Sequence, residues 1–117
     1  MNIELQGEQD GLRTLRMVGD FNIYHAADTR QALLPLLADA GTVEVDLSGV
    51  AEIDSSGVQL LIAAKKHLEA RGASLHLVRH SAAVIDALEL FDLDGYFGDP
   101  MLIPPSGQSG AGRGGHA

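Results

Sequence analysis

Two adjacent serines, Ser55 and Ser56, carry the most specific chemistry in this sequence. They follow the acidic residues Glu52 and Asp54, and they precede the long apolar segment that begins at Val58. We expect a strand, a tight turn and a helix over this stretch, so the two hydroxyls should open the helix. The first turn of a helix has unpaired backbone N–H groups and partial positive charge, so a serine there can cap the helix or carry a phosphate.

Spacing alone favours capping over phosphate transfer at this turn. Short side chains such as Asp54 and Ser55 can accept hydrogen bonds from the first N–H groups of a helix. A phosphate on Ser56 would be favoured by the helix end, but it would add about −1.5 to −2 charge beside two carboxylates. We therefore expect that such a phosphate would release a docked partner with little change of fold.

Other kinds of reactive site have weaker support. Asp54 at the end of a strand is placed like the phospho-accepting aspartate of response regulators, but the early strands lack the further acidic pair that would hold Mg²⁺. The 5 histidines lack zinc-ligand spacing, and the sequence contains no cysteine. No nucleophile–base pair can be defended. We expect a protein that is not an enzyme and holds neither a metal nor another cofactor.

The composition limits the class of partner. The chain of 117 residues fits one domain, and its formal net charge of −8 repels a phosphate backbone. Aromatic residues make up only 4%, which also argues against nucleic-acid binding. Met1–Glu4 does not resemble the start of a signal peptide, and no apolar segment is long enough to cross a bilayer. We expect a cytoplasmic protein without membrane insertion, of undetermined oligomeric state.

Hydrophobic periodicity predicts an α/β fold. We expect strands at 3–5, 12–18, 43–47 and 74–78, a connection at 48–52 and a short last strand at 96–97. We expect helices at 26–40, kinked or broken near Leu34 by Pro35 and ended by Gly41, at 56–70, and after a capping Ser81. These elements predict an N-terminal antiparallel hairpin followed by parallel βαβ units, in a mixed sheet of four to five strands with helices packed on it. The glycine-rich residues 104–117 should form a disordered tail.

The motifs around the serines resemble a known family. The stretches VDLSGV (45–50) and IDSSGVQLL (53–61) closely resemble the STAS domain, which is named after sulphate transporters and anti-sigma factor antagonists. Segments 19–24, 72–78 and 90–93 are similar to other parts of that domain. The resemblance implies a single STAS domain over residues 1–103, with the Asp-Ser-Ser-Gly motif between a strand and a helix.

The resemblance implies a regulatory binding protein. In bacterial anti-sigma factor antagonists, this domain binds an anti-sigma factor that is also a serine kinase of the histidine-kinase-like ATPase superfamily. Phosphorylation of the second serine of the motif, here Ser56, switches the antagonist off, and a phosphatase restores it. Two alternatives stay open: a non-phosphorylated STAS accessory subunit of a lipid-transport ABC complex, and a chemotaxis-associated signalling adaptor.

We predict a partner-binding surface around Ser56. It comprises Asn22, Tyr24, Asp54, Ser55, Ser56, Gly57, Val58 and Ile62. Asn22 and Tyr24 belong to the loop before the first helix, which the family layout would bring near Ser56. On a helical wheel, Val58 and Ile62 fall beside the stripe that should face the sheet, so we expect both side chains to be partly exposed.

Overall fold

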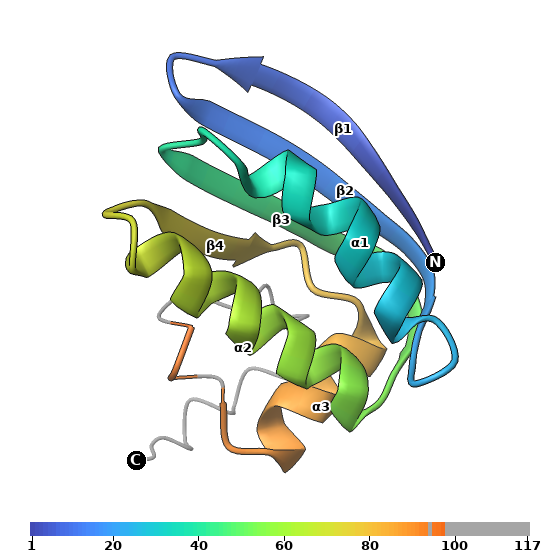
Figure 1. Ribbon diagram of the computed structural model, residues 1–117. Helices are drawn as coiled ribbons and strands as arrows, with labels where there is room; N and C mark the ends of the chain where they lie inside the picture. The colour runs from blue at the N-terminus through green and yellow to red at the C-terminus, as the bar shows by residue number, and fades with distance from the viewer. Residues whose placement is uncertain (94, 98–117) are drawn as a thin grey trace.

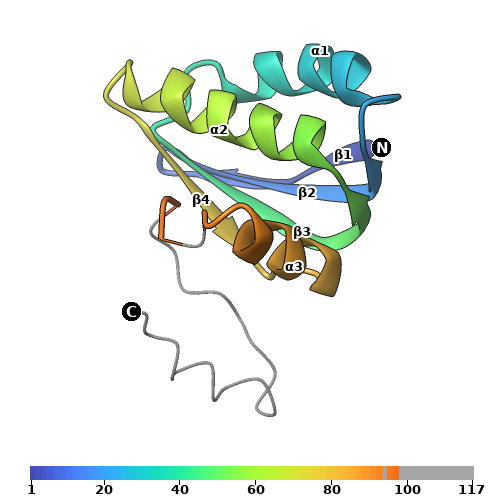
Figure 2. The same ribbon diagram turned by 90° about the horizontal axis from the view of Figure 1, so that it is seen from below.

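Strands and helices alternate along the chain, as the periodicity predicts. The computed structural model describes residues 1–93 and 95–97, and the predicted tail lies outside them. In chain order the elements are β1 (Asn2–Gln9), β2 (Leu12–Phe21), α1 (Ala26–Leu37), β3 (Thr42–Ile53), α2 (Ser55–Glu69), β4 (Ser74–Val78) and α3 (Ala82–Leu90). Helices α1 and α2 cover one face of the sheet, and α3 lies on the other (Figures 1 and 2). No helix in this part of the chain is long and apolar enough to span a membrane.

The sheet topology confirms the predicted fold class. The strand order over the described residues is β1-β2-β3-β4, with β1 antiparallel to β2 and the remaining pairs parallel. The hairpin turn is made by Asp10 and Gly11, whose φ angles of 53° and 82° are both positive. Two positive φ angles in succession give the turn a twist that matches paired antiparallel strands, and Asp-Gly adopts them readily.

The core lies between the sheet and helices α1 and α2. Alternate residues of the strands point into it, because successive side chains of a strand face opposite sides of the sheet. From the strands these buried residues are Leu15, Met17, Val43, Val45, Leu47, Leu75 and Leu77; from α1 and α2 they are Leu33, Leu37, Leu61, Ala64 and Leu68. Burying each large apolar side chain stabilises the fold by roughly 1.5–3 kcal/mol relative to its exposure to water.

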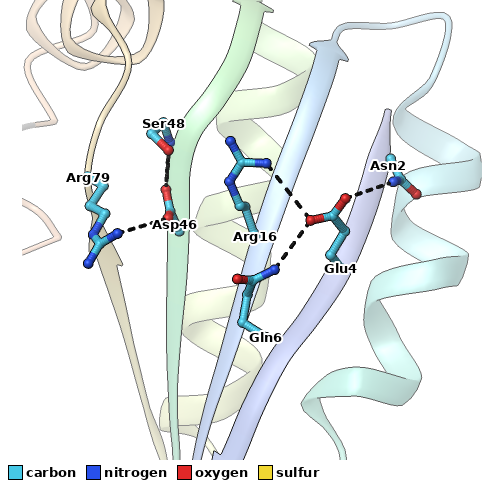
Figure 3. Close-up of polar contacts among 7 residues, drawn as sticks. All are labelled: Asn2, Glu4, Gln6, Arg16, Asp46, Ser48 and Arg79. Carbon is cyan, nitrogen blue, oxygen red and sulfur yellow. Dashed lines mark hydrogen bonds and ion pairs between the residues drawn. The ribbon is translucent and has the colours of Figure 1, made fainter.

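The opposite face of the sheet carries paired polar side chains (Figure 3). Arg16 Nη1 lies 3.9 Å from Glu4 Oε1, and Arg79 Nη1 lies 3.9 Å from Asp46 Oδ2. Asp46 Oδ1 also accepts hydrogen bonds from the backbone N–H of Ser48 at 2.8 Å and from its hydroxyl at 2.7 Å. These bonds lie where the register of β3 against β2 shifts, so Asp46 and Ser48 shape a bulge in the strand.

Three strands are longer than predicted: β1 ends at Gln9 instead of residue 5, β2 at Phe21 instead of residue 18, and β3 at Ile53 instead of residue 47. Residues 48–52 belong to β3, because the strand continues past the bulge and pairs Val50 with Gly19 and Ile53 with Phe21. The polar residues of this stretch weaken the alternation that would indicate a strand, although Val50 is buried. The predicted strand at 96–97 is wrong: Tyr96 lies in a turn, in which its N–H bonds to the carbonyl of Leu93 at 3.0 Å. The described sheet therefore has four strands.

Helix α1 is not broken by Pro35. The helix runs on to Leu37 with Pro35 exposed in its last turn. Proline lacks an N–H and interferes with the turn before it, yet here only two residues of the helix follow it. The predicted role of Gly41 is also wrong, because its N–H donates to the carbonyl of Gly11 at 3.1 Å instead of ending the helix.

Two arginines from outside α1 hold its C-terminal end. Arg13 Nη1 donates to the carbonyls of Leu36 and Ala38 at 2.7 and 2.8 Å. Arg71 Nη1 donates to the carbonyl of Leu37 at 3.1 Å. The last carbonyls of a helix lack partners within the helix and carry partial negative charge, so guanidinium groups suit them. A hydrogen bond with Glu8 raises the pKa of Arg13, which keeps that side chain charged.

Candidate functional site

Asp54 is the residue that caps α2. Its Oδ1 accepts hydrogen bonds from the backbone N–H groups of Ser56 at 2.9 Å and Gly57 at 3.3 Å. This arrangement satisfies N–H groups that the first turn of a helix would otherwise leave unpaired. The capping role predicted for Asp54 is confirmed, whereas Ser55 is the first residue of the helix and not its cap.

The two serine side chains differ in accessibility. Ser55 is exposed, and Ser56 is partly exposed. Both belong to the first turn of α2, which follows directly from the buried strand β3. Because Asp54 caps the helix, the Ser56 hydroxyl is not needed for capping. It lies at the positive end of the helix, where a negatively charged group is stabilised.

Gly57 brings α2 close to the end of β2. A Cβ atom at this position would lie 2.6 Å from the carbonyl oxygen of Phe21, and 2.9 Å from both Ile53 Cγ1 and Phe21 Cγ. Real Cβ atoms do not approach other heavy atoms so closely. Gly57 is buried, so it positions the serines from beneath the surface.

The loop between β2 and α1 is bound to the start of α2. Asn22 Nδ2 donates to Glu52 Oε1 at 2.9 Å, and the Ile23 N–H donates to Asp54 Oδ2 at 3.1 Å. The N–H of Tyr24 donates to Asn22 Oδ1 at 3.0 Å, which closes a tight turn. The predicted proximity of this loop to the serines is therefore confirmed.

The same loop exposes two large apolar side chains. Ile23 is 66% exposed and Tyr24 is 87% exposed. The sequence prediction included Tyr24 but missed Ile23. The signal was present, since an isoleucine next to a turn-forming asparagine has no strand or helix face to bury it.

A groove lies on the other side of the serines. Its volume is about 230 Å³, and it is lined by Ser55, Val58, Gln59 and Ile62 of α2 together with Phe91 and Leu93, which follow α3. Ile62 is partly exposed, as predicted. The expected exposure of Val58 is wrong: it is only 2% exposed. A helical wheel of α2 alone does not include the segment after α3, whose Phe91 and Leu93 line this groove together with Val58.

The buried face of α3 does not include Phe91. Val84, Ala87 and Leu88 are buried there, but Phe91 is 42% exposed. The helix ends at Leu90, so Phe91 is its C-terminal cap and leaves the helical stripe. Its ring joins the groove beside α2 instead of the core. Among the described residues, no group of three or more His, Asp or Glu side chains is arranged to hold a metal ion.

The family follows from a comparison with known sequences. Residues 4–104 match the sequence model of the family described as "Mlab, STAS domain". The chain belongs to the STAS domain family. The Bacillus subtilis (strain 168) anti-sigma-B factor antagonist is 25% identical to this STAS domain over 95 residues, which cover 81% of the chain and 84% of the relative.

Solved structures share the fold of this STAS domain. An anti-sigma factor antagonist from Mycobacterium paratuberculosis superposes with a TM-score of 0.72 at 24% identity, with 96% of this chain and 95% of that chain covered. The anti-sigma factor antagonist SpoIIAA in its unphosphorylated form gives 0.70 at 17% identity, with 97% of each chain covered. The phosphorylated form of SpoIIAA from Bacillus gives 0.65 at 17% identity, covering 96% and 98%. The fold is therefore that of anti-sigma factor antagonists.

Proposed function

We propose that this STAS domain is a partner-switching regulator like the anti-sigma factor antagonists. It binds an anti-sigma factor that is also a serine kinase, and phosphorylation of Ser56 releases that partner. The observation that carries the proposal is the capping of α2 by Asp54, which leaves the partly exposed Ser56 hydroxyl available to a kinase. The similarity to a protein known in unphosphorylated and phosphorylated forms supports the same function.

The surroundings of Ser56 suit a docked partner. The exposed Ile23 and Tyr24 lie on the loop bound to Asp54, and the groove beside Ile62 begins at Ser55. Apolar side chains on both sides of a reactive hydroxyl can anchor a partner while its catalytic groups reach that hydroxyl. In this proposal Asn22, Asp54 and Gly57 hold the surface in shape, and Val58 supports it from below.

Charge explains why a phosphate would act as a switch. The transfer forms a bond from Ser56 Oγ to the γ-phosphorus of the partner's ATP and breaks the bond from that phosphorus to the bridging oxygen, which leaves with ADP. The hydroxyl proton passes to a base of the kinase. The new group adds about −1.5 to −2 charge. The helix end tolerates that charge, but Glu52 and Asp54 already make the site acidic on a chain of net charge −8. A partner that fits the neutral hydroxyl then loses contact, and the fold stays intact.

The regulator is not an enzyme in this proposal. The kinase supplies the ATP and its catalytic groups, and a separate phosphatase hydrolyses the phosphoserine with water. The domain works in the cytoplasm, without binding nucleic acid or inserting into a membrane. A chemotaxis-associated adaptor would use the same surface and differ only in its partner.

A second candidate is an accessory subunit of a lipid-transport ABC complex. The matched family is described as "Mlab, STAS domain", a description that does not name an anti-sigma factor antagonist, and this supports the second candidate. Such a subunit would use the surface around Ser56 as a constant contact with an ATPase and would not be phosphorylated. The two candidates therefore differ in whether the Ser56 hydroxyl is modified.

Phosphorylation by serine-kinase anti-sigma factors from the same genome tests the proposal. With ATP present, intact-mass spectrometry should show one added phosphate group. Ser56→Ala should abolish the addition, and the matched variant Ser55→Ala should retain it. Ser56→Asp should weaken binding of the kinase in calorimetry. Modification of Ser55 instead would refute the assignment. Absence of modification, together with co-purification with an ABC-transporter ATPase, would establish the accessory subunit.

A further inference from the structure

A second groove lies away from the serines, between α1 and α2. These helices run side by side over one face of the sheet (Figure 1). The groove has a volume of about 170 Å³ and is lined by Arg30, Leu33, Leu34 and Leu37 of α1 and by Leu60, Ala63, Ala64 and His67 of α2. Both sets follow the spacing i, i+3, i+4, i+7, so each helix presents one continuous stripe to the groove.

The charge of this groove differs from that of the rest of the molecule. The chain has 16 Asp and Glu against 8 Lys and Arg, yet the lining has one arginine, one histidine and no acidic side chain. Arg30 and His67 are both exposed at its rim. Within residues 1–93 and 95–97, Arg30 makes no hydrogen bond or ion pair. The other arginines there all have partners. Arg13 pairs with Glu8, Arg16 with Glu4 and Arg79 with Asp46, and Arg71 donates to the carbonyl of Leu37.

The two basic side chains lie toward opposite ends of the groove. Arg30 is in the first half of α1, and His67 is near the C-terminal end of α2, while the two helices run in the same direction (Figure 1). A ligand with an alkyl chain and one acidic head would meet only one of them. A helix with two acidic residues two turns apart, about 10 Å along its axis, would meet both.

We propose that the groove between α1 and α2 binds an acidic amphipathic helix of another protein. Its apolar side chains enter between Leu34 and Ala63, and its carboxylates face Arg30 and His67. A guanidinium is a permanent positive charge, and an imidazole donates a hydrogen bond to a carboxylate in either protonation state. Helices in grooves are commonly held by apolar anchors at this spacing. This inference goes beyond the proposed function and does not depend on phosphorylation of Ser56.

A synthetic peptide can serve as the probe. It is acetylated and amidated, about 15 residues long so that it forms a helix, with leucines at i, i+3, i+4 and i+7 and glutamates seven residues apart beside that stripe. The matched control peptide has lysines in place of those glutamates. Amide chemical shifts in NMR locate binding on the full chain, and fluorescence anisotropy measures affinity. The acidic peptide should shift amides of α1 and α2 along the groove, and the basic peptide should bind at least about tenfold more weakly.

Charge reversal tests the two rim residues. Arg30→Glu and His67→Glu should each weaken binding of the acidic peptide by about tenfold, because each reversal replaces an attraction by a like-charge repulsion. The control Lys66→Glu, which reverses an exposed charge of α2 outside the lining, should change it less than about twofold. Ser56→Ala should bind the peptide like the unaltered chain, so the two proposals can fail separately. Equal effects of all three reversals, or shifts confined to the groove beside Ile62, would overturn the inference. So would self-association of the chain that Arg30→Glu abolishes in sedimentation velocity.

Discussion

The side chain of Asp54 and the backbone N–H of Ile23 are joined by a 3.1 Å hydrogen bond across 31 residues of sequence. The other carboxylate oxygen of Asp54 caps α2. One side chain thus fixes both the helix that carries Ser56 and the loop that exposes Tyr24. Because both parts of the surface depend on one carboxylate, they should respond together when the whole Asp54 carboxylate is removed.

Replacing Asp54 should separate its two roles. Asp54→Ala removes the cap and the bond to Ile23, and we expect the free energy of unfolding to fall by about 1–2 kcal/mol in urea titrations. Asp54→Asn keeps one oxygen that can cap the helix, so its loss should be smaller. Hydrogen exchange should become faster at Ile23 in both variants, and at Ser56 and Gly57 only in Asp54→Ala. Equal protection of Ile23 in all three proteins would contradict this account.

Gly57 should tolerate no side chain. The Cβ of Gly57→Ala would clash with the carbonyl of Phe21, and we expect a loss of about 1–3 kcal/mol in unfolding free energy because backbone must move. Gly7→Ala is the matched control, since a Cβ there meets no atom within 4 Å. Chemical denaturation measures both. A loss for Gly57→Ala no greater than for Gly7→Ala would show that α2 can move away from β2 at little cost.

Arg13 should stabilise the end of α1 more than an ordinary surface arginine. Arg13→Gln removes the charged donor shared by the carbonyls of Leu36 and Ala38. We expect a lower unfolding temperature by calorimetry and faster hydrogen exchange in the last turn of α1. Arg16→Gln, which breaks only a 3.9 Å pair with Glu4, should change neither. If the two variants behave alike, the hydrogen bonds from Arg13 to the end of α1 do not stabilise that helix.

The sequence predicted the elements whose signal is local. Strand β4 was predicted at its observed bounds, because 74–78 alternates between buried and partly buried residues and Gly72 lies two positions before it. The prediction that Ser81 caps α3 is also confirmed, since the Ser81 hydroxyl accepts a hydrogen bond from the N–H of Val84 at 3.2 Å. In both cases the residues that decide the structure lie within a few positions of one another.

The errors arose where distant contacts decide the structure. Residues 48–52 form a strand because β2 pairs with them, and the carbonyls at the end of α1 that follow Pro35 bind Arg13 and Arg71. Neither partner is adjacent in sequence. The same limit applies at the site. The motif located the serines and the cap, but no pattern within α2 reveals that Val58 is buried or that Phe91 and Leu93 line a groove beside the helix.

The pair Ile62 and Val58 should separate binding from stability. Ile62 is partly exposed in the groove that begins at Ser55, although it also packs against the core, so Ile62→Glu should lower the unfolding free energy by about 1 kcal/mol, less than Val58→Ala. It should weaken binding of the kinase partner at least about tenfold in calorimetry, because a charge enters an apolar contact. Val58→Ala removes buried methyl groups and should cost about 2 kcal/mol, with little effect on affinity where the protein is folded. If Ile62→Glu instead destabilises the fold as much as Val58→Ala and binding is unchanged, Ile62 belongs to the core and the partner docks elsewhere.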